Sequence, residues 1–350
     1  MDSNAVNQSL LSEKPEHMSF LCEQLDLGIP AGVPERVLGG FHHRMWRLET
    51  DSGLYAVKQL GPDTDATDPG TVDHYNMTEA VAEAFAHRGI SAIHALRRKK
   101  DYLQTVAGAG YLVYPWTDAV AIDPKNLSEP HALRIAALMA KMHRADIQVS
   151  GLKETPLASH AEDKILLLVD RAIACHTRDY QHLQEHLPGL LAIAARQEEA
   201  RRILARHRVI CHGDLDQKNV LWSTTGEPVF IDWESARLLN ATHETVSVAL
   251  EWSGITSAFE FSLFEKFIAA YQEAGGVIDG DSLSAAFDRI AGNWLDWLMF
   301  NVGRTIDLAD PEQRAVGAAQ VDLALATLLR LERFSSRLVS RTREVVLAAC

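Results

Sequence analysis

Residues 208–232 read RVICHGDLDQKNVLWSTTGEPVFID, a short island of strand and loop inside a long region of helical periodicity. Its apolar and β-branched residues flank a polar loop, which is a common way for a rigid scaffold to present reactive side chains. Within the loop, His212, Asp214 and Asn219 follow the pattern H-x-D-x-x-x-x-N, and Asp232 stands at the end of the following strand. This island therefore carries most of the chemical information in the chain.

Phosphoryl transfer from a nucleotide to a hydroxyl requires side chains of these types. One carboxylate orients the attacking hydroxyl and accepts its proton, while an amide oxygen and a second carboxylate hold Mg²⁺ against the nucleotide phosphates. The short loop should place Asp214 and Asn219 on the same side of a cleft, and a hairpin through 223–228 should return Asp232 beside them. We therefore predict Asp214 as the catalytic base and Asn219 and Asp232 as metal ligands.

The sequence HGDLDQKNVL, followed by FIDWE, resembles a motif of the aminoglycoside phosphotransferase and choline kinase branch of the kinase-like superfamily. In that branch, HGDLHxxNVL precedes IDW or IDF. The resemblance implies an α+β, bilobal, protein-kinase-like fold with a small β-rich N-lobe and a larger, mainly α-helical C-lobe. It also implies that His212 has a structural role, bracing the catalytic loop against the segment that carries the metal-binding aspartate.

Two positions of the loop depart from the pattern of this branch. Asp216 stands where a histidine is common, and Lys218 stands where a small residue is frequent. Lys218 is either a catalytic residue that helps to neutralise the transferring phosphoryl group or a solvated lysine on the rim of the loop. Asp216 either faces a cationic substrate or caps the turn, and the sequence does not choose between these roles.

The first third of the chain shows the strand and turn signals of a small β-rich lobe. Alternating apolar residues over 36–60, with a turn at 51–53, predict two or three strands. A helix is expected from about 72 to 87, where a glycine follows its end. Further strands are expected near 91–96, 101–106 and 110–115.

The resemblance assigns nucleotide-binding roles within this lobe. Lys58 ends the strand-like segment YAVK and would contact the α and β phosphates, held by a glutamate of the following helix. We prefer Glu79 as that partner, but Glu83 lies one turn further on the same face and remains open. Gly39 and Gly40 would let backbone amides approach phosphate, although the pair fits an ordinary hairpin turn equally well.

The pattern of the sequence changes near residue 118, which predicts the domain boundaries. We expect a flexible N-terminal extension over 1–20, a nucleotide-binding N-lobe over 21–113 and a hinge over 114–118. A helical C-lobe over 119–350 would hold the catalytic loop and the substrate pocket. Tyr114 begins the hinge, and the resemblance implies that the backbone of this connector would bind adenine.

Composition narrows the function classes. Apolar residues make up 47% and charged residues 23% of the 350 residues, which are ordinary values for a globular protein. The net charge of −13 argues against nucleic acid or an anionic membrane as a partner. The four cysteines form no CxxC pair, and no apolar run is long enough to cross a bilayer, so we expect reduced thiols and a cytoplasmic location.

The sequence indicates the residues of the acceptor pocket less clearly than those of the catalytic loop. In the branch that the chain resembles, the acceptor binds between the catalytic loop and the C-terminal helices, where acidic and aromatic residues are interleaved over 234–254 and 290–307. Such residues would suit a polyamine sugar or a quaternary ammonium group, but they also fit the buried and solvated faces of amphipathic helices. The candidates are Glu234, Glu251, Trp252, Asp296 and Trp297.

The leading hypothesis is an ATP- and Mg²⁺-dependent kinase that transfers the γ-phosphate to a hydroxyl of a small, cationic acceptor. Aminoglycoside-type antibiotics are the favoured class, which would imply a role in antibiotic resistance. The alternatives are a metabolic kinase acting on choline, ethanolamine, homoserine or a sugar, and a non-catalytic nucleotide-binding protein. No A-P-E pattern follows Asp232, which argues against a protein kinase. We expect a monomer or a homodimer.

Overall fold

The computed structural model describes residues 15–37, 43–152, 161–307 and 311–348. The chain divides into two compact units. The first consists of Met1–Ala121, Ile147–Leu152 and Val220–Ala236, and the second consists of Ile122–Asp146, Lys153–Asn219 and Arg237–Cys350. The segment that follows the catalytic loop therefore groups with the N-terminal third of the chain.

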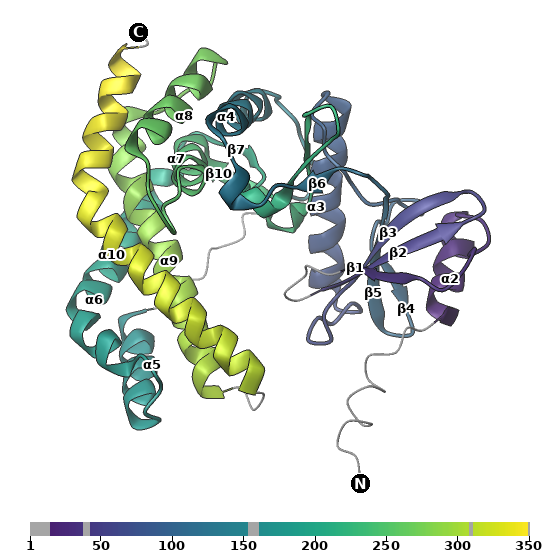
Figure 1. Cartoon of the computed structure of the whole chain (residues 1–350), viewed down its shortest axis with the longest axis horizontal. Coiled ribbons are helices and arrows are strands. Elements are labelled where there is room, and N and C mark those ends of the chain that lie inside the picture. Colours follow the sequence, from purple (N-terminus) through teal and green to yellow (C-terminus); the bar gives the residue numbers. More distant parts are fainter. Residues whose placement is uncertain (1–14, 38–42, 153–160, 308–310, 349–350) are drawn as a thin grey trace. The chain divides into compact units, whose positions relative to one another are not determined.

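The first unit is built on a five-stranded antiparallel sheet in the order β1-β2-β3-β5-β4 (Figure 1). Its strands are β1 (Glu35–Val37), β2 (Arg44–Thr50), β3 (Gly53–Gln59), β4 (Gln104–Val106) and β5 (Ala109–Pro115). A second sheet joins β6 (Val120–Ala121), β8 (Val220–Trp222) and β9 (Pro228–Phe230). The helices of this unit are α2 (Pro15–Leu25), α3 (Pro69–His87) and the short η3 (Trp233–Ser235). Residues 15–20, which the sequence predicts to be flexible, thus begin α2.

Alternation of side chains along the strands gives the five-stranded sheet two different faces. Val57 of β3 packs in one apolar cluster with Leu21 of α2. Lys58, the next residue along β3, must point to the opposite face. Its register partner Leu112 packs there with Tyr75 of α3. The strand pattern therefore directs Lys58 toward α3.

The segment 91–96 is not a strand, contrary to the sequence prediction, and forms only an isolated bridge. Its backbone groups serve different partners, because Ala95 N donates to the carboxylate of Glu79 while Leu96 N donates to Val113 O. A ladder requires successive hydrogen bonds to one neighbouring strand. The apolar pattern of the segment thus reflects burial without sheet pairing.

The second unit is mainly helical, and together with the small antiparallel sheet of the first unit it confirms the predicted α+β, kinase-like fold class. Its strands β7 (Arg208–Cys211) and β10 (Arg237–Asn240) form a two-stranded antiparallel sheet. Its helices are η1 (Pro124–Asn126), α4 (Glu129–His143), α5 (Glu162–Ala174), α6 (Tyr180–Leu204), η2 (Gln217–Asn219), α7 (Ala241–Trp252), α8 (Phe261–Glu273), η4 (Gly280–Ser282), α9 (Leu283–Asp307) and α10 (Pro311–Ala348).

The long helices α9 and α10 lie side by side in this unit (Figure 1). Leu295, Leu298 and Val302 follow the helical spacing of a buried stripe on α9 and are almost fully buried. They pack with Ile193 of α6 and Leu328 of α10 in one apolar cluster. Among the described residues, no helix is both long and apolar enough to cross a membrane.

Candidate active site

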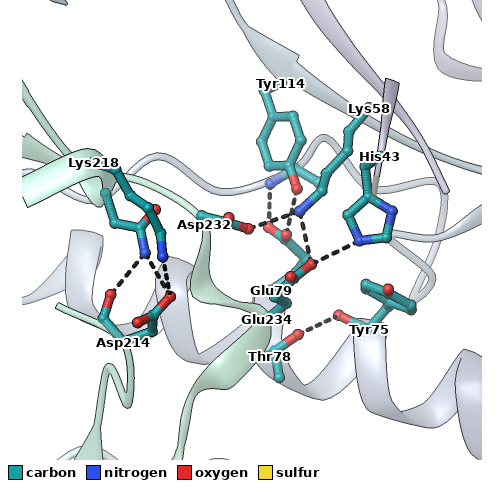
Figure 2. A network of polar contacts seen from close by, with 12 residues as sticks. His43, Lys58, Tyr75, Thr78, Glu79, Tyr114, Asp214, Lys218, Asp232 and Glu234 are labelled. Atoms are coloured by element: carbon teal, nitrogen blue, oxygen red, sulfur yellow. Dashed lines mark hydrogen bonds and ion pairs between the residues drawn. The ribbon is translucent and has the colours of Figure 1, made fainter. Parts of the chain in front are cut away.

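Lys58 lies at the centre of a polar cluster in the first unit. Its Nζ donates to Asp232 Oδ1 at 2.7 Å and to Glu234 Oε2 at 2.8 Å, as Figure 2 shows. Burial alone would lower the pKa of Lys58, but the two carboxylates outweigh it and hold the pKa above its ordinary value. The lysine is therefore charged and fully paired with acidic groups of the segment 220–236.

Glu79, the preferred partner of Lys58, is buried on α3. Its carboxylate accepts a hydrogen bond from Tyr114 Oη at 2.7 Å (Figure 2). It also accepts one from Ala95 N at 2.6 Å. Burial raises the pKa of Glu79 to about 7, against the opposing effect of these two bonds and of the charge on Lys58. Glu79 thus lies within the electrostatic reach of Lys58, while the recorded hydrogen bonds of Lys58 go to Asp232 and Glu234.

Glu83, the alternative partner, has other contacts. Tyr102 Oη donates to its carboxylate at 2.7 Å, and Arg97 forms an ion pair with it at 3.5 Å. These contacts favour Glu79 over Glu83 as the glutamate that acts on Lys58, and the assignment remains a prediction.

Asp232 follows β9 in a left-handed backbone conformation, with φ of 61°. Aspartate adopts this region more readily than most residues, and the turn directs the chain into η3. Trp233 is fully buried against Phe85 of α3, with 5.3 Å between ring centroids. The buried tryptophan fixes the turn between the two acidic residues that contact Lys58.

Glu234 was predicted to face the substrate, and the structure places it against Lys58 and His43. Gly61 N donates to His43 Nδ1 at 3.1 Å, so a neutral His43 carries its proton on Nε2, which lies 3.2 Å from Glu234 Oε2. Burial alone would raise the pKa of Glu234, but His43 and Lys58 lower it to about 2. Glu234 is therefore ionised at neutral pH.

The loop with the H-x-D-x-x-x-x-N pattern lies in the second unit, between β7 and η2. Asn219 Nδ2 donates to Asp214 Oδ2 at 2.9 Å and to Asp214 O at 2.7 Å. Because the amide nitrogen is used in this way, the amide oxygen of Asn219 is the atom that can ligate a cation. Asp214 is 43% exposed at its side chain, so its carboxylate is fixed by Asn219 and open to a substrate.

Lys218 projects from the same loop toward two aspartates. Its Nζ lies 3.0 Å from Asp216 Oδ2 and 3.4 Å from Asp214 Oδ2. Burial would lower the pKa of Lys218, but both carboxylates raise it and the net shift is upward. Lys218 thus carries a full positive charge beside the predicted base.

Glu251 and Trp252, two predicted substrate residues, lie at the end of α7 against the loop. Trp252 Nε1 donates to Leu215 O at 3.1 Å, and Glu251 O accepts from Gln217 Nε2 at 3.1 Å. Burial raises the pKa of the Glu251 side chain to about 8, and the charges of the nearby aspartates act in the same direction. The structure therefore gathers an acidic group of three side chains around the loop: Asp214, Asp216 and Glu251.

Sequence reasoning missed a buried network beneath the loop. Glu244 Oε1 accepts from Gly213 N at 2.7 Å, and Glu244 Oε2 lies 2.6 Å from His143 Nε2. The other ring nitrogen of His143 is 2.8 Å from Tyr271 Oη. Hydrogen bonds from His143 and Gly213 lower the pKa of Glu244 to about 2, although burial opposes them. The one sequence signal for this network is that His143 and Glu244 are polar residues at positions expected to be buried in two predicted helices.

His212, predicted to be structural, is fully buried beside this network. Gly213 follows it with φ of 82°, a conformation that glycine adopts without strain. The carboxylate of Glu244 thus anchors the backbone at the residue directly before Asp214.

The two remaining substrate candidates lie on α9. Gln197 Nε2 of α6 donates to Asp296 Oδ2 at 3.0 Å. Trp297 is 38% exposed, stacks on Phe300 and donates to Gln320 of α10. These contacts are with residues of α6, α9 and α10. The predicted phosphate-binding pair Gly39 and Gly40 lies outside the described residues.

The chain has the kinase-like fold shared by several solved phosphotransferases. The structure of spectinomycin phosphotransferase APH(9)-Ia with ADP and spectinomycin matches with a TM-score of 0.67 and 13% identity, over 92% of this chain and 99% of that chain. The choline kinase LicA from Streptococcus pneumoniae matches with a TM-score of 0.56 and 16% identity, over 90% of this chain and 99% of that chain. At these identities, the similarity concerns the fold.

The model of the phosphotransferase enzyme family matches residues 34–286, and the chain belongs to this family. A curated relative, ethanolamine kinase 2 of Homo sapiens, is 31% identical over 138 residues, which cover 36% of this chain. The match covers 32% of the human protein, so the chain spans about a third of the length of this relative.

Proposed function

We propose that this chain is an ATP- and Mg²⁺-dependent kinase that transfers the γ-phosphate to a hydroxyl of a small, cationic acceptor. The observation that carries the proposal is the loop carboxylate of Asp214, which Asn219 orients and which remains exposed beside Lys218. A base for a bound hydroxyl needs this combination of fixed direction and access.

In the proposed reaction, Asp214 orients the acceptor hydroxyl and takes its proton as the oxygen attacks the γ-phosphorus. The bond to the β-phosphate oxygen breaks, and ADP leaves. Lys58 positions the α and β phosphates, and Glu79 helps to place Lys58. Lys218 would reduce the negative charge that develops on the transferring group.

The residues predicted as metal ligands suit Mg²⁺. Asn219 offers an amide oxygen and Asp232 offers a carboxylate, which are the hard oxygen ligands that this ion prefers. In the chain, Asn219 directly precedes Val220, and Val220 pairs with Phe230, two residues before Asp232. The bound ion would neutralise phosphate charge.

The acidic group around the loop supports a cationic acceptor. Asp214, Asp216 and Glu251 face a single lysine, Lys218, so negative charge exceeds positive charge among these four side chains. An ammonium group of the acceptor would balance it and would favour ionisation of Glu251. Aminoglycoside-type antibiotics, which carry several amines and hydroxyls, are our favoured acceptor class.

An amino alcohol such as ethanolamine is the second candidate. The similarity to ethanolamine kinase 2 of Homo sapiens favours it, and one ammonium group beside one hydroxyl fits the same acidic group. A cytoplasmic location and a monomeric or homodimeric state remain predictions.

The first test is ADP release by the purified chain with Mg·ATP across aminoglycosides, other hydroxylated antibiotics, choline, ethanolamine, homoserine and sugars. We expect one class to stimulate turnover. Asp214→Asn should lose at least about two orders of magnitude in kcat, which is a typical contribution of a general base, and should still bind Mg·ATP. Unchanged turnover in Asp214→Asn would exclude Asp214 as the base, and binding of Mg·ATP without any turnover would favour the non-catalytic alternative.

A further inference from the structure

Three buried side chains of the second unit carry polar atoms without a protein partner. Arg289 of α9, His243 of α7 and Gln197 of α6 are 2%, 4% and 2% exposed. Within the described part of the chain, all three guanidinium nitrogens of Arg289, Nε2 of His243 and Oε1 of Gln197 lack a hydrogen-bond partner. A buried charge without a counter-ion or hydrogen bonds is strongly unfavourable, so Arg289 requires a partner from outside the chain.

The three side chains come from α9 and from the two helices that pack against it. Helix α9 packs against both α6 and α7. A Cβ atom added at Gly292 would lie 2.5 Å from Gln197 Nε2, so Gln197 rests directly on α9. Arg289 precedes Gly292 by three residues and therefore lies on the same side of α9, one turn away.

The electrostatic surroundings of these side chains are positive. Burial lowers the pKa of His243 to about 3, and the charges of Arg289 and Arg237 act in the same direction. Burial also lowers the pKa of Arg289, with Arg237 and Arg201 adding to the effect. Several cationic groups from α6, β10 and α9 thus act on a single buried region.

The carboxylates near this region do not satisfy Arg289. Asp296 opposes the fall in the pKa of Arg289, but its recorded hydrogen bond comes from Gln197. Glu244 acts on His243, and its two oxygens contact His143 and Gly213. The guanidinium group therefore has no hydrogen-bonding carboxylate among the described residues.

We propose that Arg289, His243 and Gln197 enclose a binding site for one small inorganic oxyanion, phosphate or sulfate, between α6, α7 and α9. The guanidinium group presents five N–H donors in a fixed plane, which matches two oxygens of such an anion. A neutral His243 with its proton on Nε2 adds a further donor. Gln197 Oε1 would accept from Arg289 or from a bridging water. The site contains no residue that we assign to phosphoryl transfer, so the anion would be a structural component.

The first test compares thermal unfolding of the full chain with and without sulfate at constant ionic strength. Sulfate at about 100 times its Kd should raise the unfolding midpoint of the wild type by about 4 °C. Arg289→Met removes the charge but retains an apolar chain of similar length, and its midpoint should not respond. Arg343→Met changes an exposed arginine of α10 and should respond as the wild type does.

Two further comparisons separate this site from other effects of sulfate. Lys58→Met, which removes the proposed phosphate contact of the nucleotide site, should retain the full response to sulfate. A response that disappears in Lys58→Met would place the anion at the nucleotide site and overturn the proposal. An equal response in Arg289→Met and the wild type would identify a general salt effect and would also overturn it.

A direct measurement does not depend on the stability of the variants. Chain purified from phosphate buffer is desalted and denatured, and the released anion is measured by ion chromatography. We expect about one phosphate per wild-type chain and none from Arg289→Met. Arg289→Lys should release an intermediate amount, because a single ammonium group replaces the planar set of N–H donors of the guanidinium group. Chloride in place of phosphate, or no anion from the wild type, would contradict an oxyanion site.

Discussion

At the scale of single residues, Lys58 of the proposed nucleotide site is already paired with acidic groups. Its ammonium group contacts Asp232 and Glu234, and Glu234 also contacts His43. A nucleotide that binds at Lys58 must therefore compete with two carboxylates. In the proposed site, a divalent cation held by Asp232 would balance the charge of that carboxylate, and nucleotide binding would then depend on the metal.

Replacing Lys58 with methionine tests this account. Lys58→Met should lower kcat/KM for ATP by about 100-fold, as expected from the loss of one charge-assisted hydrogen bond to phosphate. Lys58→Arg is the matched control and should retain more activity because it keeps the charge. The measurement is an ATP titration of the coupled assay. Equal kcat/KM values for Lys58→Met and the wild type would exclude the proposed phosphate contact.

Glu251 should make stability depend on pH. Its pKa in the folded chain is about 8, above the ordinary 4.5, so the folded state retains a proton that the unfolded chain loses between these values. The stabilisation by this proton is complete below pH 4.5 and is lost as the pH rises through 8.

Glu251→Gln should therefore match the wild type near pH 4.5 and exceed it in the free energy of unfolding by about 2 kcal/mol at pH 9, a value reduced for partial solvent screening. Urea unfolding across this range measures the difference. Glu273→Gln, at an exposed position of α8, is the control and should show no such divergence. Parallel pH profiles for wild type and Glu251→Gln would contradict the raised pKa.

Among helices and strands, the buried contact of Glu244 connects α7 to the catalytic loop. Glu244 accepts from Gly213 N and from His143 of α4, and His143 contacts Tyr271 of α8. Three helices thus fix the backbone beside Asp214. The helices could be predicted from their periodicity, but a contact between side chains about 100 positions apart in the chain has no local sequence signal.

The two oxygens of Glu244 can be tested separately. Glu244→Ala leaves Gly213 N and His143 without their buried partner and should lower the free energy of unfolding by about 3 kcal/mol and also reduce kcat. Glu244→Gln keeps an acceptor for Gly213 N and should recover a large part of both. Urea unfolding and the kinase assay measure the two effects. If both variants lost kcat equally while remaining folded, the bond to Gly213 would not be what positions the loop.

For the chain as a whole, Mg²⁺ and nucleotide should stabilise the fold jointly. Mg·ATP at about 100 times its Kd should raise the stability by about 2.7 kcal/mol, and removal of Mg²⁺ with EDTA should abolish most of the effect. Asp232→Ala should not respond to Mg·ATP. Differential scanning calorimetry measures the unfolding midpoints from which these changes in stability are obtained. If Mg·ATP stabilised Asp232→Ala as much as the wild type, Asp232 would not be a ligand of the metal.

The sequence predicts the fold class and those site residues that lie close together in the chain. Asp214 and Asn219 lie five positions apart in one loop, and the structure brings them into contact. From its position after Asp232, the sequence predicts Glu234 to face the acceptor. That position contains no signal of its contact with Lys58. That contact joins residues 176 positions apart and depends on how β3, α3 and η3 pack. Long-range pairing therefore limited the prediction of the site more than residue chemistry did.

The membership of residues 220–236 in the first unit has a practical consequence for dissecting this protein. The chain passes from the second unit to the first at 219/220 and returns at 236/237, so no single truncation separates the two units. A fragment that ended at the predicted boundary of 113 would lack Asp232 and Glu234. It would leave the ammonium of Lys58 without both of its counter-ions, and nucleotide binding measured on that fragment would describe a differently charged site.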